Sequence, residues 1–464
     1  MRAQLEAALA KRVGTFYAAS DSLWDFAELG LIEHRSSALL SGLLEKEGFT
    51  VTRGVSGIPT AFIAEAVIGS GGPSIGFLAE YDALPMLSQK AGCTVHDPVA
   101  PGAPGHGCGH NTMGAMQALN VCALKEVLEN AKMSARLVYF GTPAEELLAG
   151  KAFMARDGVF DGMDAIIDCH AGAGFSASHG TENTAVFSFV AAFHGKTAHA
   201  GARPWDGRSA ADAVELMHAG TERMREHMLP NQRVHWVTMN DASAPNVVPN
   251  FSRTWYYARG NDDDIRALYE RLADCAKGAA LMTGTTHEMR QLAACHQRYS
   301  NKALAEALFA NINAVGVPEY SEEEQAFIRE LQKNYNVPEI GMAVNVFLED
   351  AATVPQKGGS SDVGDVTLCS PTCTLRYPTW VPGATSHTWP VTACQKTSIA
   401  HKGIYAAALV AGLTVCDMLT KPALLNAIKE EFAILHAKRP YESLLTPEAT
   451  PPLEWHEDDM AKFR

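Results

Sequence analysis

The sequence has no excess of positive charge, no long apolar run and no cluster of cysteines. Its net charge is −14 and its pI about 5.6, which disfavours nucleic acid as a partner because phosphate binding needs a cationic face. No stretch approaches the roughly 20 apolar residues of a membrane span, so we expect no membrane association. The ten cysteines are scattered over 464 residues, unlike the dense framework of a small secreted domain.

The N-terminal residues also lack the pattern of a signal peptide. Glu6 interrupts the first apolar run, and residues 1–12 are typical of an amphipathic helix. We therefore expect a cytoplasmic protein whose thiols stay reduced and are available as ligands. There is no internal repeat or low-complexity tract, and a chain of 464 residues is long enough for two domains.

Short apolar runs alternate with helical patterns in the first part of the chain, which predicts an α/β fold with a sheet flanked by helices. From about residue 183 the pattern is that of a separate α+β unit. We predict one domain from residues 1–182 and 301–464, with a second domain, 183–300, inserted into it. The predicted strands are 74–79, 136–140, 165–168, 184–193, 233–239 and 251–258, and the predicted helices include 112–131, 147–158, 208–229, 262–283 and a single apolar helix at 391–418.

Residues Pro104–Asn111 carry the first chemical signal. Cys108 and His110 flank one glycine at the point where a Pro- and Gly-rich loop meets a helical pattern. A helix N-terminus and a bound cation both favour the thiolate over the thiol. The motif predicts a metal site, and the alternative is a buried free cysteine beside a capping loop.

Other metal-binding side-chain types follow the predicted strands. Asp82, the pair Glu145-Glu146 and His170 come after successive apolar runs, and ligands of parallel sheets bind beyond the carboxyl ends of the strands. Thr142 and Glu145 also fit a capping box, which would explain Glu145 without any chemistry. That alternative leaves Glu146 unexplained, whereas two adjacent carboxylates suit a site where one binds a cation and the other moves a proton.

His387 lies in the loop Pro382–Pro390, just before the last predicted helix. The Gly and Pro residues of this loop restrict its shape. By itself it is a surface-loop histidine as readily as a ligand. Asp82 and His170 have similar structural alternatives, a turn residue and a buried core histidine.

Five motifs, in this order along the chain, together resemble the M20 metallopeptidase and amidohydrolase family, in particular its subfamily with a Cys-Gly-His motif. They are Pro104–Asn111, Gly141–Glu146, Asp168–His170, His194–Gly201 and Ser386–Pro390. The resemblance implies a zinc-peptidase-like mixed sheet and an inserted lid and dimerisation domain. It implies two divalent ions, Zn or Mn, with Glu145 as general base and Asp82 supporting the ligands. The implied ligands are Cys108, His110, Glu146, His170 and His387.

The resemblance also assigns residues of the inserted domain. His199 matches a histidine that holds the reacting carbonyl oxygen, often in the neighbouring subunit, and Asn246 matches a residue near the substrate. Arg203 is a candidate for a substrate carboxylate because of its guanidinium geometry, or else a surface arginine. The sequence departs from many relatives at Asn111, where they have Asp, and at Glu80, where they have His.

The implied activity is metal-assisted hydrolysis of the amide bond of an N-acyl amino acid, such as p-aminobenzoyl-glutamate, or of a dipeptide. Two alternatives remain: hydrolysis of another C–N bond with release of ammonia, and a subunit active only with a homologous partner. We expect a small-molecule substrate and a homodimer, or else an assembly with such a homologous subunit.

Overall fold

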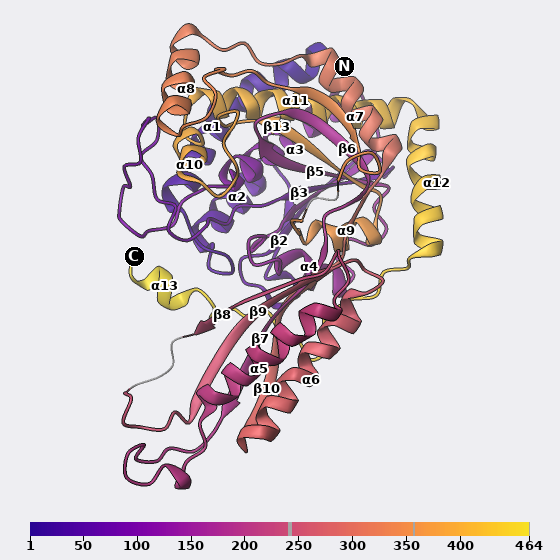
Figure 1. The fold of residues 1–464 in the computed structure, drawn as a ribbon. Coiled ribbons are helices and arrows are strands. Elements are labelled where there is room, and N and C mark those ends of the chain that lie inside the picture. Colours follow the sequence, from indigo (N-terminus) through magenta and orange to yellow (C-terminus); the bar gives the residue numbers. More distant parts are fainter. Residues whose placement is uncertain (240–243, 356–357, 464) are drawn as a thin grey trace.

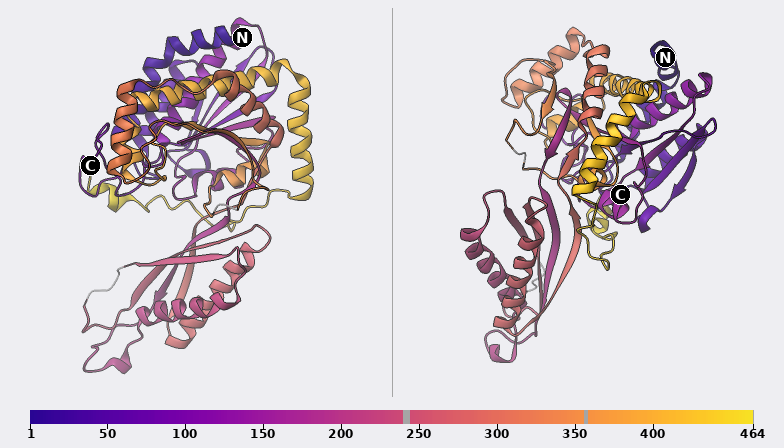
Figure 2. Two further views of the ribbon diagram at one scale, coloured as in Figure 1. Left: turned by 45° about the horizontal axis from the view of Figure 1, so that its top comes forward. Right: turned by 90° about the vertical axis from the view of Figure 1, so that its right-hand side faces the viewer.

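The structure, a computed structural model, describes residues 1–239, 244–355 and 358–463. Within this part of the chain the strands form two sheets, each in its own lobe (Figures 1 and 2). The strands are β1 (Thr50–Arg53), β2 (Phe62–Ile68), β3 (Ser74–Ala79), β4 (Ala135–Gly141), β5 (Ala165–Gly172), β6 (Phe175–Glu182), β7 (Ala185–His194), β8 (Arg233–Met239), β9 (Phe251–Gly260), β10 (Thr286–Cys295), β11 (Arg298–Ser300), β12 (Val346–Asp350) and β13 (Thr372–Pro378).

Helices cover both faces of the larger sheet. In the described parts of both lobes the helices are α1 (Arg2–Phe26), α2 (His34–Lys46), α3 (His110–Asn130), α4 (Gly150–Arg156), α5 (Ala210–Met224), α6 (Ile265–Thr283), α7 (Lys302–Val315), α8 (Glu322–Asn334), α9 (Val363–Cys369), α10 (Trp389–Cys394), α11 (Ser398–Thr420), α12 (Pro422–Lys438) and α13 (Glu457–Ala461). The helices α1, α3 and α11 pack together over one face, while α4 and α9 lie on the other and share a core with the smaller lobe.

The larger sheet is mixed and confirms the predicted α/β fold class. Among the described strands its order is β1-β2-β4-β3-β5-β13-β6-β11, with β12 paired to β6. The four central strands β4, β3, β5 and β13 run parallel, and antiparallel strands flank them on each side. Residues Ile75–Ala79 of β3 are all buried, as expected for a strand with helices on both faces. Parallel pairing places the carboxyl ends of β3, β4 and β5 at one edge.

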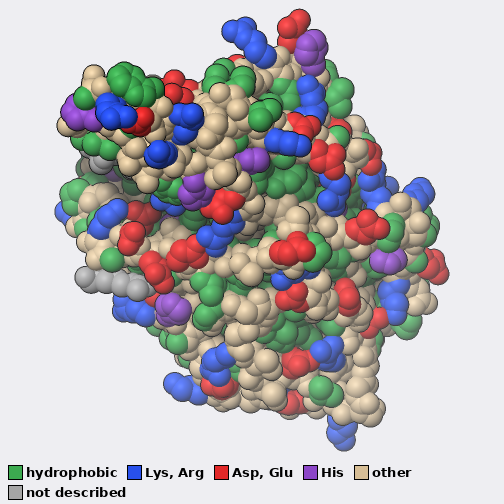
Figure 3. Space-filling model, turned by 90° about the horizontal axis from the view of Figure 1, so that it is seen from below, with side chains coloured by type: hydrophobic (Ala, Val, Ile, Leu, Met, Phe, Trp, Pro, Cys, Tyr) green, Lys and Arg blue, Asp and Glu red, His purple; other side chains and the backbone are tan. Residues whose placement is uncertain are grey.

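The smaller lobe consists of residues 185–295. Its sheet has the order β10-β7-β9-β8, and α5 and α6 lie side by side on one face (Figure 1). Along β9 buried residues alternate with partly exposed ones, because only one face of this sheet packs against helices. In the view from below, basic and acidic side chains are interspersed over the surface (Figure 3).

Several predictions of local structure are wrong. The apolar segment predicted as one helix at 391–418 is two helices, α10 and α11; Thr397 closes the first by donating its hydroxyl hydrogen to the carbonyl of Cys394 (2.7 Å). The strand predicted at 165–168 extends to Gly172, so His170 lies within β5. Helices α9 and α12 and strands β10 and β13 were not among the predicted elements.

Helix α11 also corrects the expectation that no segment is apolar enough to cross a membrane. By length and composition Ser398–Thr420 meets that criterion, with a mean hydropathy of 1.6. However, 72% of its apolar window is buried within the protein, where it packs against α1, α3 and α7. Its hydrophobicity is therefore that of a core helix, which is apolar all round because protein surrounds it.

Candidate metal centre and substrate pocket

Cys108 and His110 lie where a long loop enters α3. Gly109 caps the helix with φ 82°, and a Cβ there would lie 2.6 Å from that of Ala171, so the position requires glycine. The backbone N–H of His387 donates to the carbonyl of Gly107 (2.8 Å), which joins two loops that are far apart in the sequence. Burial, with a smaller contribution from Glu146, raises the pKa of the Cys108 thiol. A thiolate there therefore needs a cation beside it.

Asp82 connects His110 with the loop of the acidic pair. Its Oδ1 accepts a hydrogen bond from Nδ1 of His110 (2.9 Å), and its Oδ2 accepts one from the backbone N–H of Glu146 (2.9 Å). This pairing leaves Nε2 of His110 buried without a hydrogen-bond partner among the described residues. In metal-binding histidines one ring nitrogen is typically hydrogen-bonded to a carboxylate, and the other is free to bind the metal.

The loop after β4 is not the predicted helix start, because α4 begins only at Gly150. The hydroxyl of Thr142 donates to the carbonyl of Ala79 (3.0 Å) instead of capping a helix. Ala144 has φ 57°, a left-handed conformation that is uncommon for alanine. The buried carboxylate of Glu33 stabilises this turn by accepting the N–H of Ala144 (2.8 Å). The capping-box explanation of Glu145 is therefore wrong.

The turn directs Glu145 and Glu146 towards the same space. Oε2 of Glu146 lies 3.4 Å from Nε2 of His387, while Oε1 has no hydrogen-bond partner among the described residues. Burial, followed by the negative charge of Glu80, raises the pKa of Glu145 to about 7. A carboxylate that titrates near neutral pH is suited to accepting and donating a proton.

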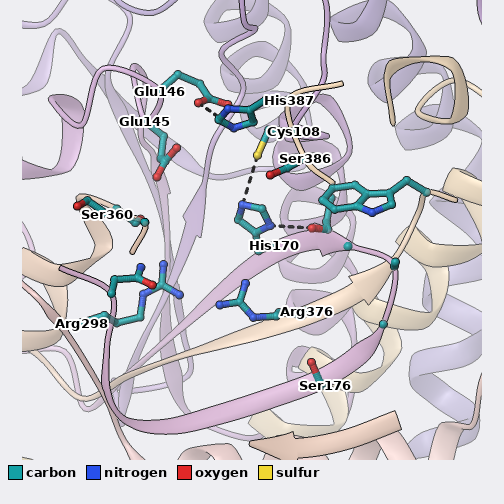
Figure 4. Close-up of a pocket in the computed structure, with 18 of the residues that line it drawn as sticks. Cys108, Glu145, Glu146, His170, Ser176, Arg298, Ser360, Arg376, Ser386 and His387 are labelled. Carbon is teal, nitrogen blue, oxygen red and sulfur yellow. Dashed lines mark hydrogen bonds and ion pairs between the residues drawn. The ribbon is translucent and has the colours of Figure 1, made fainter. Parts of the chain in front are cut away.

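His170 and His387 complete the group. Nδ1 of His170 donates to the carbonyl of Ala171 (2.7 Å), and Nε2 lies 3.6 Å from Sγ of Cys108 (Figure 4). Burial and then the charge of Arg376 lower the pKa of His170, and burial and then His110 lower that of His387. Both imidazoles are thus favoured in the neutral form, which is the form that binds metal.

The structure brings the five predicted ligands together. Within each of three groups, the potential ligand atoms lie within 4.8 Å of one another. The buried atoms without partners and the mixed thiol, imidazole and carboxylate donors fit divalent transition metals. The groups are Cys108 with His110 and His170, Cys108 with Glu146 and His387, and Glu80 with His110 and Glu145.

Glu80 belongs to a buried charged network next to these groups. Its Oε2 lies 3.4 Å from Nε2 of His110, and its Oε1 lies 2.8 Å from Nζ of Lys151. Lys151 is fully buried and also pairs with Asp362, at 2.6 Å. At Glu80, where many relatives have His, the chain thus also has a buried lysine, Lys151, and a second carboxylate, Asp362, neither of which was among the predicted site residues.

The candidate ligands open into a cavity of about 870 Å³. Cys108, Glu146, His170 and His387 lie at one end, and guanidinium groups lie on the opposite side (Figure 4). The apolar part of the lining includes Leu84, Tyr257, Ile340, Phe347 and Trp380, and its arginines are Arg259, Arg298 and Arg376. The pocket therefore combines metal-binding groups, positive charge and aromatic surface. These arginines were not among the predicted site residues, because no motif marks them: Arg298 and Arg376 lie on short strands that were not predicted, and Arg259 follows directly on the predicted strand 251–258.

The candidate residues of the smaller lobe lie apart from this cavity. His199 is exposed, and its Nδ1 accepts hydrogen bonds from the N–H groups of Gly201 and Ala202 (3.2 and 3.1 Å). Asn246 is exposed, and Arg203, 68% exposed, pairs with Asp206 at 2.6 Å. None of the three lines the cavity as the described residues form it. Within one chain the structure does not bring them to the candidate ligands.

Comparisons with known proteins agree with this geometry. The model of peptidase family M20/M25/M40 matches residues 76–390. One of the subunits of the p-aminobenzoyl-glutamate hydrolase of Escherichia coli (strain K12) is 36% identical, over 93% of this chain and 95% of its own length. The Xaa-Arg dipeptidase of Mus musculus is 30% identical, over 91% of this chain and 89% of its own.

A solved structure shows the same fold. It is a dinuclear metal binding peptidase of the M20 family from Bacillus subtilis, with a TM-score of 0.55 and 17% identity over 88% of this chain and 99% of that one. The family model covers well over half of the present sequence, and the relatives align over nearly its whole length. The chain therefore belongs to the peptidase family M20/M25/M40 and is a hydrolase.

Proposed function

We propose that this protein is a binuclear metal-dependent amidohydrolase that cleaves the amide bond of N-acyl amino acids. The preferred substrates are N-aroyl compounds such as p-aminobenzoyl-glutamate. The observation that supports this most directly is that five metal-binding side chains and the separate carboxylate of Glu145 meet at one end of a single cavity. The relative with a p-aminobenzoyl-glutamate hydrolase name supports the choice of substrate.

Cys108, His110, Glu146, His170 and His387 would hold two divalent ions, Zn or Mn. The thiol favours Zn, whereas the imidazoles and carboxylate also suit Mn. Bound there, the ions would supply Lewis acidity that polarises the scissile carbonyl and makes water easier to ionise. Asp82 orients His110 for this role through the hydrogen bond to Nδ1.

Glu145 is the proposed general base. It is buried, lies within the candidate metal groups and has a pKa raised to about 7. In the ionised form its carboxylate takes a proton from the attacking water, and in the protonated form it passes that proton to the leaving nitrogen. The other carboxylate of the pair, Glu146, is then left to bind metal.

His199, Asn246 and Arg203 would act across a subunit interface. All three are exposed in the single chain and lie away from its own cavity. In a homodimer, His199 of one chain would stabilise the oxyanion formed in the cavity of the neighbour, as a hydrogen-bond donor positioned for the transition state. Asn246 and Arg203 would contact the substrate from the same side.

The aromatic part of the cavity suits an aroyl group. Trp380 is 7% exposed and lines the cavity together with Phe347 and Tyr257. Aromatic rings at such a site bury a flat acyl group and stabilise it by stacked or edge-on contacts.

All ten cysteines lie in the described residues and are free thiols, which supports the proposal of a cytoplasmic location.

The experiment that tests this function is hydrolysis of an N-acyl amino acid panel by the purified chain, with metal content measured on the same samples. Glu145→Gln should keep its metal and lose activity by at least about 100- to 10,000-fold, the range typical of general bases. Glu129→Gln, at an exposed helix position, is the matched control. Full activity of Glu145→Gln would contradict the assignment of the base.

Two other outcomes are distinguished by the same assay. Release of ammonia in place of an amino acid would indicate a non-peptide C–N bond as substrate. Activity that appears only after addition of a homologous subunit would indicate a chain that functions as half of a pair, in line with the name of the Escherichia coli relative, which is one subunit of its enzyme.

A further inference from the structure

The charged side chains at the end of the cavity away from the candidate metal ligands indicate what kind of amino acid part the substrate has. Three arginines lie there, and their partners differ. Arg298 is 3% exposed, donates to Oγ1 of Thr374 (2.9 Å) and lies 3.9 Å from the carboxylate of Glu182. Its positive charge is therefore already compensated by the protein.

The other two arginines have no carboxylate partner among the described residues. Arg259 is partly buried, and Nη1 donates only to the hydroxyl of Ser360 (2.6 Å). Arg376 is partly buried, and its guanidinium has neither a hydrogen bond nor an ion pair within residues 1–239, 244–355 and 358–463. A partly buried guanidinium without an anion is costly, because its loss of hydration is not offset. Both groups therefore have unused capacity for an anionic ligand.

The position of Arg376 relates it directly to the candidate metal centre. It lies on β13, opposite His170 on β5 in the parallel register and opposite Ser176 on β6 in the antiparallel one. Neighbouring strands are about 4.8 Å apart, so the backbone of Arg376 lies one strand away from that of His170, a candidate ligand. In Figure 4 its side chain lies between His170 and Ser176 and points into the cavity.

We propose that Arg376 binds one of the two carboxylates of the leaving glutamate and that Arg259 binds the other, so that these two arginines make the site selective for a dicarboxylic amino acid. This inference rests on the proposed amidohydrolase function. Two uncompensated guanidiniums match two carboxylates, and a guanidinium binds a carboxylate through two parallel hydrogen bonds. The same charges repel a cationic side chain, so an arginine dipeptide of the kind named for the Mus musculus relative is a poor substrate here.

The test uses three amides with the same p-aminobenzoyl group. Their amine parts are glutamate, glutamine, which lacks the side-chain carboxylate, and 4-aminobutyrate, which lacks the α-carboxylate. With the wild-type chain, removal of either carboxylate should lower kcat/KM by about 10- to 100-fold, as expected for loss of a charged hydrogen bond. Equal kcat/KM for glutamate and glutamine would overturn the dicarboxylate proposal.

Arg376→Met identifies which carboxylate Arg376 binds. It should lower kcat/KM for the glutamate amide by about 10- to 100-fold, mainly through KM, and have little effect on the analogue that lacks the carboxylate in question. Arg376→Lys should restore part of the loss. Arg225→Met, which removes a surface arginine of the smaller lobe paired with Glu222, is the control. An equal loss on all three amides would refute the role of Arg376.

Binding of the free amino acids separates failure of this inference from failure of the proposed function. Calorimetric titration of the metal-loaded protein should show tighter binding of L-glutamate than of L-glutamine or 4-aminobutyrate, and Arg376→Met should reduce this preference. If no amide is hydrolysed, the amidohydrolase proposal fails. The titration then still shows whether Arg376 and Arg259 form a binding site for a dicarboxylate. Equal binding of the three compounds would overturn the site itself.

Discussion

Replacement of Lys151 by methionine should destabilise the protein from within the buried network beside the candidate metal centre. Lys151 Nζ lies 2.6 Å from Asp362 Oδ1 and 2.8 Å from Glu80 Oε1, and the three side chains are at most 2% exposed. Methionine keeps most of the length of the side chain but leaves two carboxylates buried without a cation. Breaking a buried ion pair in this way typically costs about 3–5 kcal/mol.

Protonation limits this cost. Burial raises the pKa of Asp362 to about 7 even with Lys151 beside it, so in the variant this carboxyl takes up a proton at neutral pH instead of remaining charged. We therefore expect a loss near the lower value, about 3 kcal/mol, of an unfolding free energy that is typically about 5–15 kcal/mol. The effect should be smaller at pH 5.5, where Asp362 is already protonated in both proteins.

The assay is urea unfolding at pH 7.5 and pH 5.5, with the free energy taken from the midpoint and slope. Lys125→Met is the matched control, because Lys125 forms a partly exposed pair with Glu129 (3.0 Å) on α3 worth at most about 0.5 kcal/mol. The combination of Lys151→Met with Glu80→Gln and Asp362→Asn should recover most of the loss. A cost for Lys151→Met no larger than that of Lys125→Met would refute this account of the network.

Three further predictions concern other parts of the molecule. Cys108→Ala should weaken metal binding by at least about 10-fold, measured as metal per chain after dialysis, and unchanged occupancy would show that Cys108 is not a ligand. Mixing His199→Ala with Glu145→Gln should restore part of the activity that each variant lacks, whereas an inactive mixture would argue against His199 acting across the interface. Burial lowers the pKa of His296, but Asp262 and Asp365 outweigh this effect and raise the pKa to about 9. The protonated His296 therefore stabilises the folded protein by about 3 kcal/mol below about pH 6.5. This stabilisation is lost as the pH rises through 9. His296→Gln should flatten this decline in urea unfolding, and an unchanged pH dependence would contradict it.

The loop that carries Glu145 and Glu146 depends on contacts from distant parts of the chain. Ala144 adopts a left-handed backbone that is uncommon for alanine, and Glu33, in the segment between α1 and α2, holds it through the N–H of Ala144. A second contact fixes the end of the turn, since a Cβ on Gly150 would lie 1.8 Å from the carbonyl oxygen of Pro143. The orientation of the acidic pair is thus a property of the folded core.

The sequence by itself determined those features of the protein that short segments express. The Cys-Gly-His motif at the start of a helix, the helical periods of α1, α3 and α6 and the succession of apolar runs at β3, β4 and β5 are all local. They were enough to predict the α/β fold class and the family. They also named the side chains that meet at the carboxyl edge of the sheet, because parallel strands bring their ends together.

Only the tertiary structure decided what surrounds that edge. Strand β13 was missed because it is short and half polar and lies in a part of the chain rich in Gly, Pro, Ser and Thr, although it takes a central place in the sheet. The pairing of Lys151 with Asp362 joins residues 211 positions apart, and no local pattern predicts such a contact. The choice between a capping box and a left-handed turn at Ala144 was likewise made by Glu33. In each case the deciding free energy comes from burying charges and polar groups beside partners that are distant in the chain, which a local pattern does not encode.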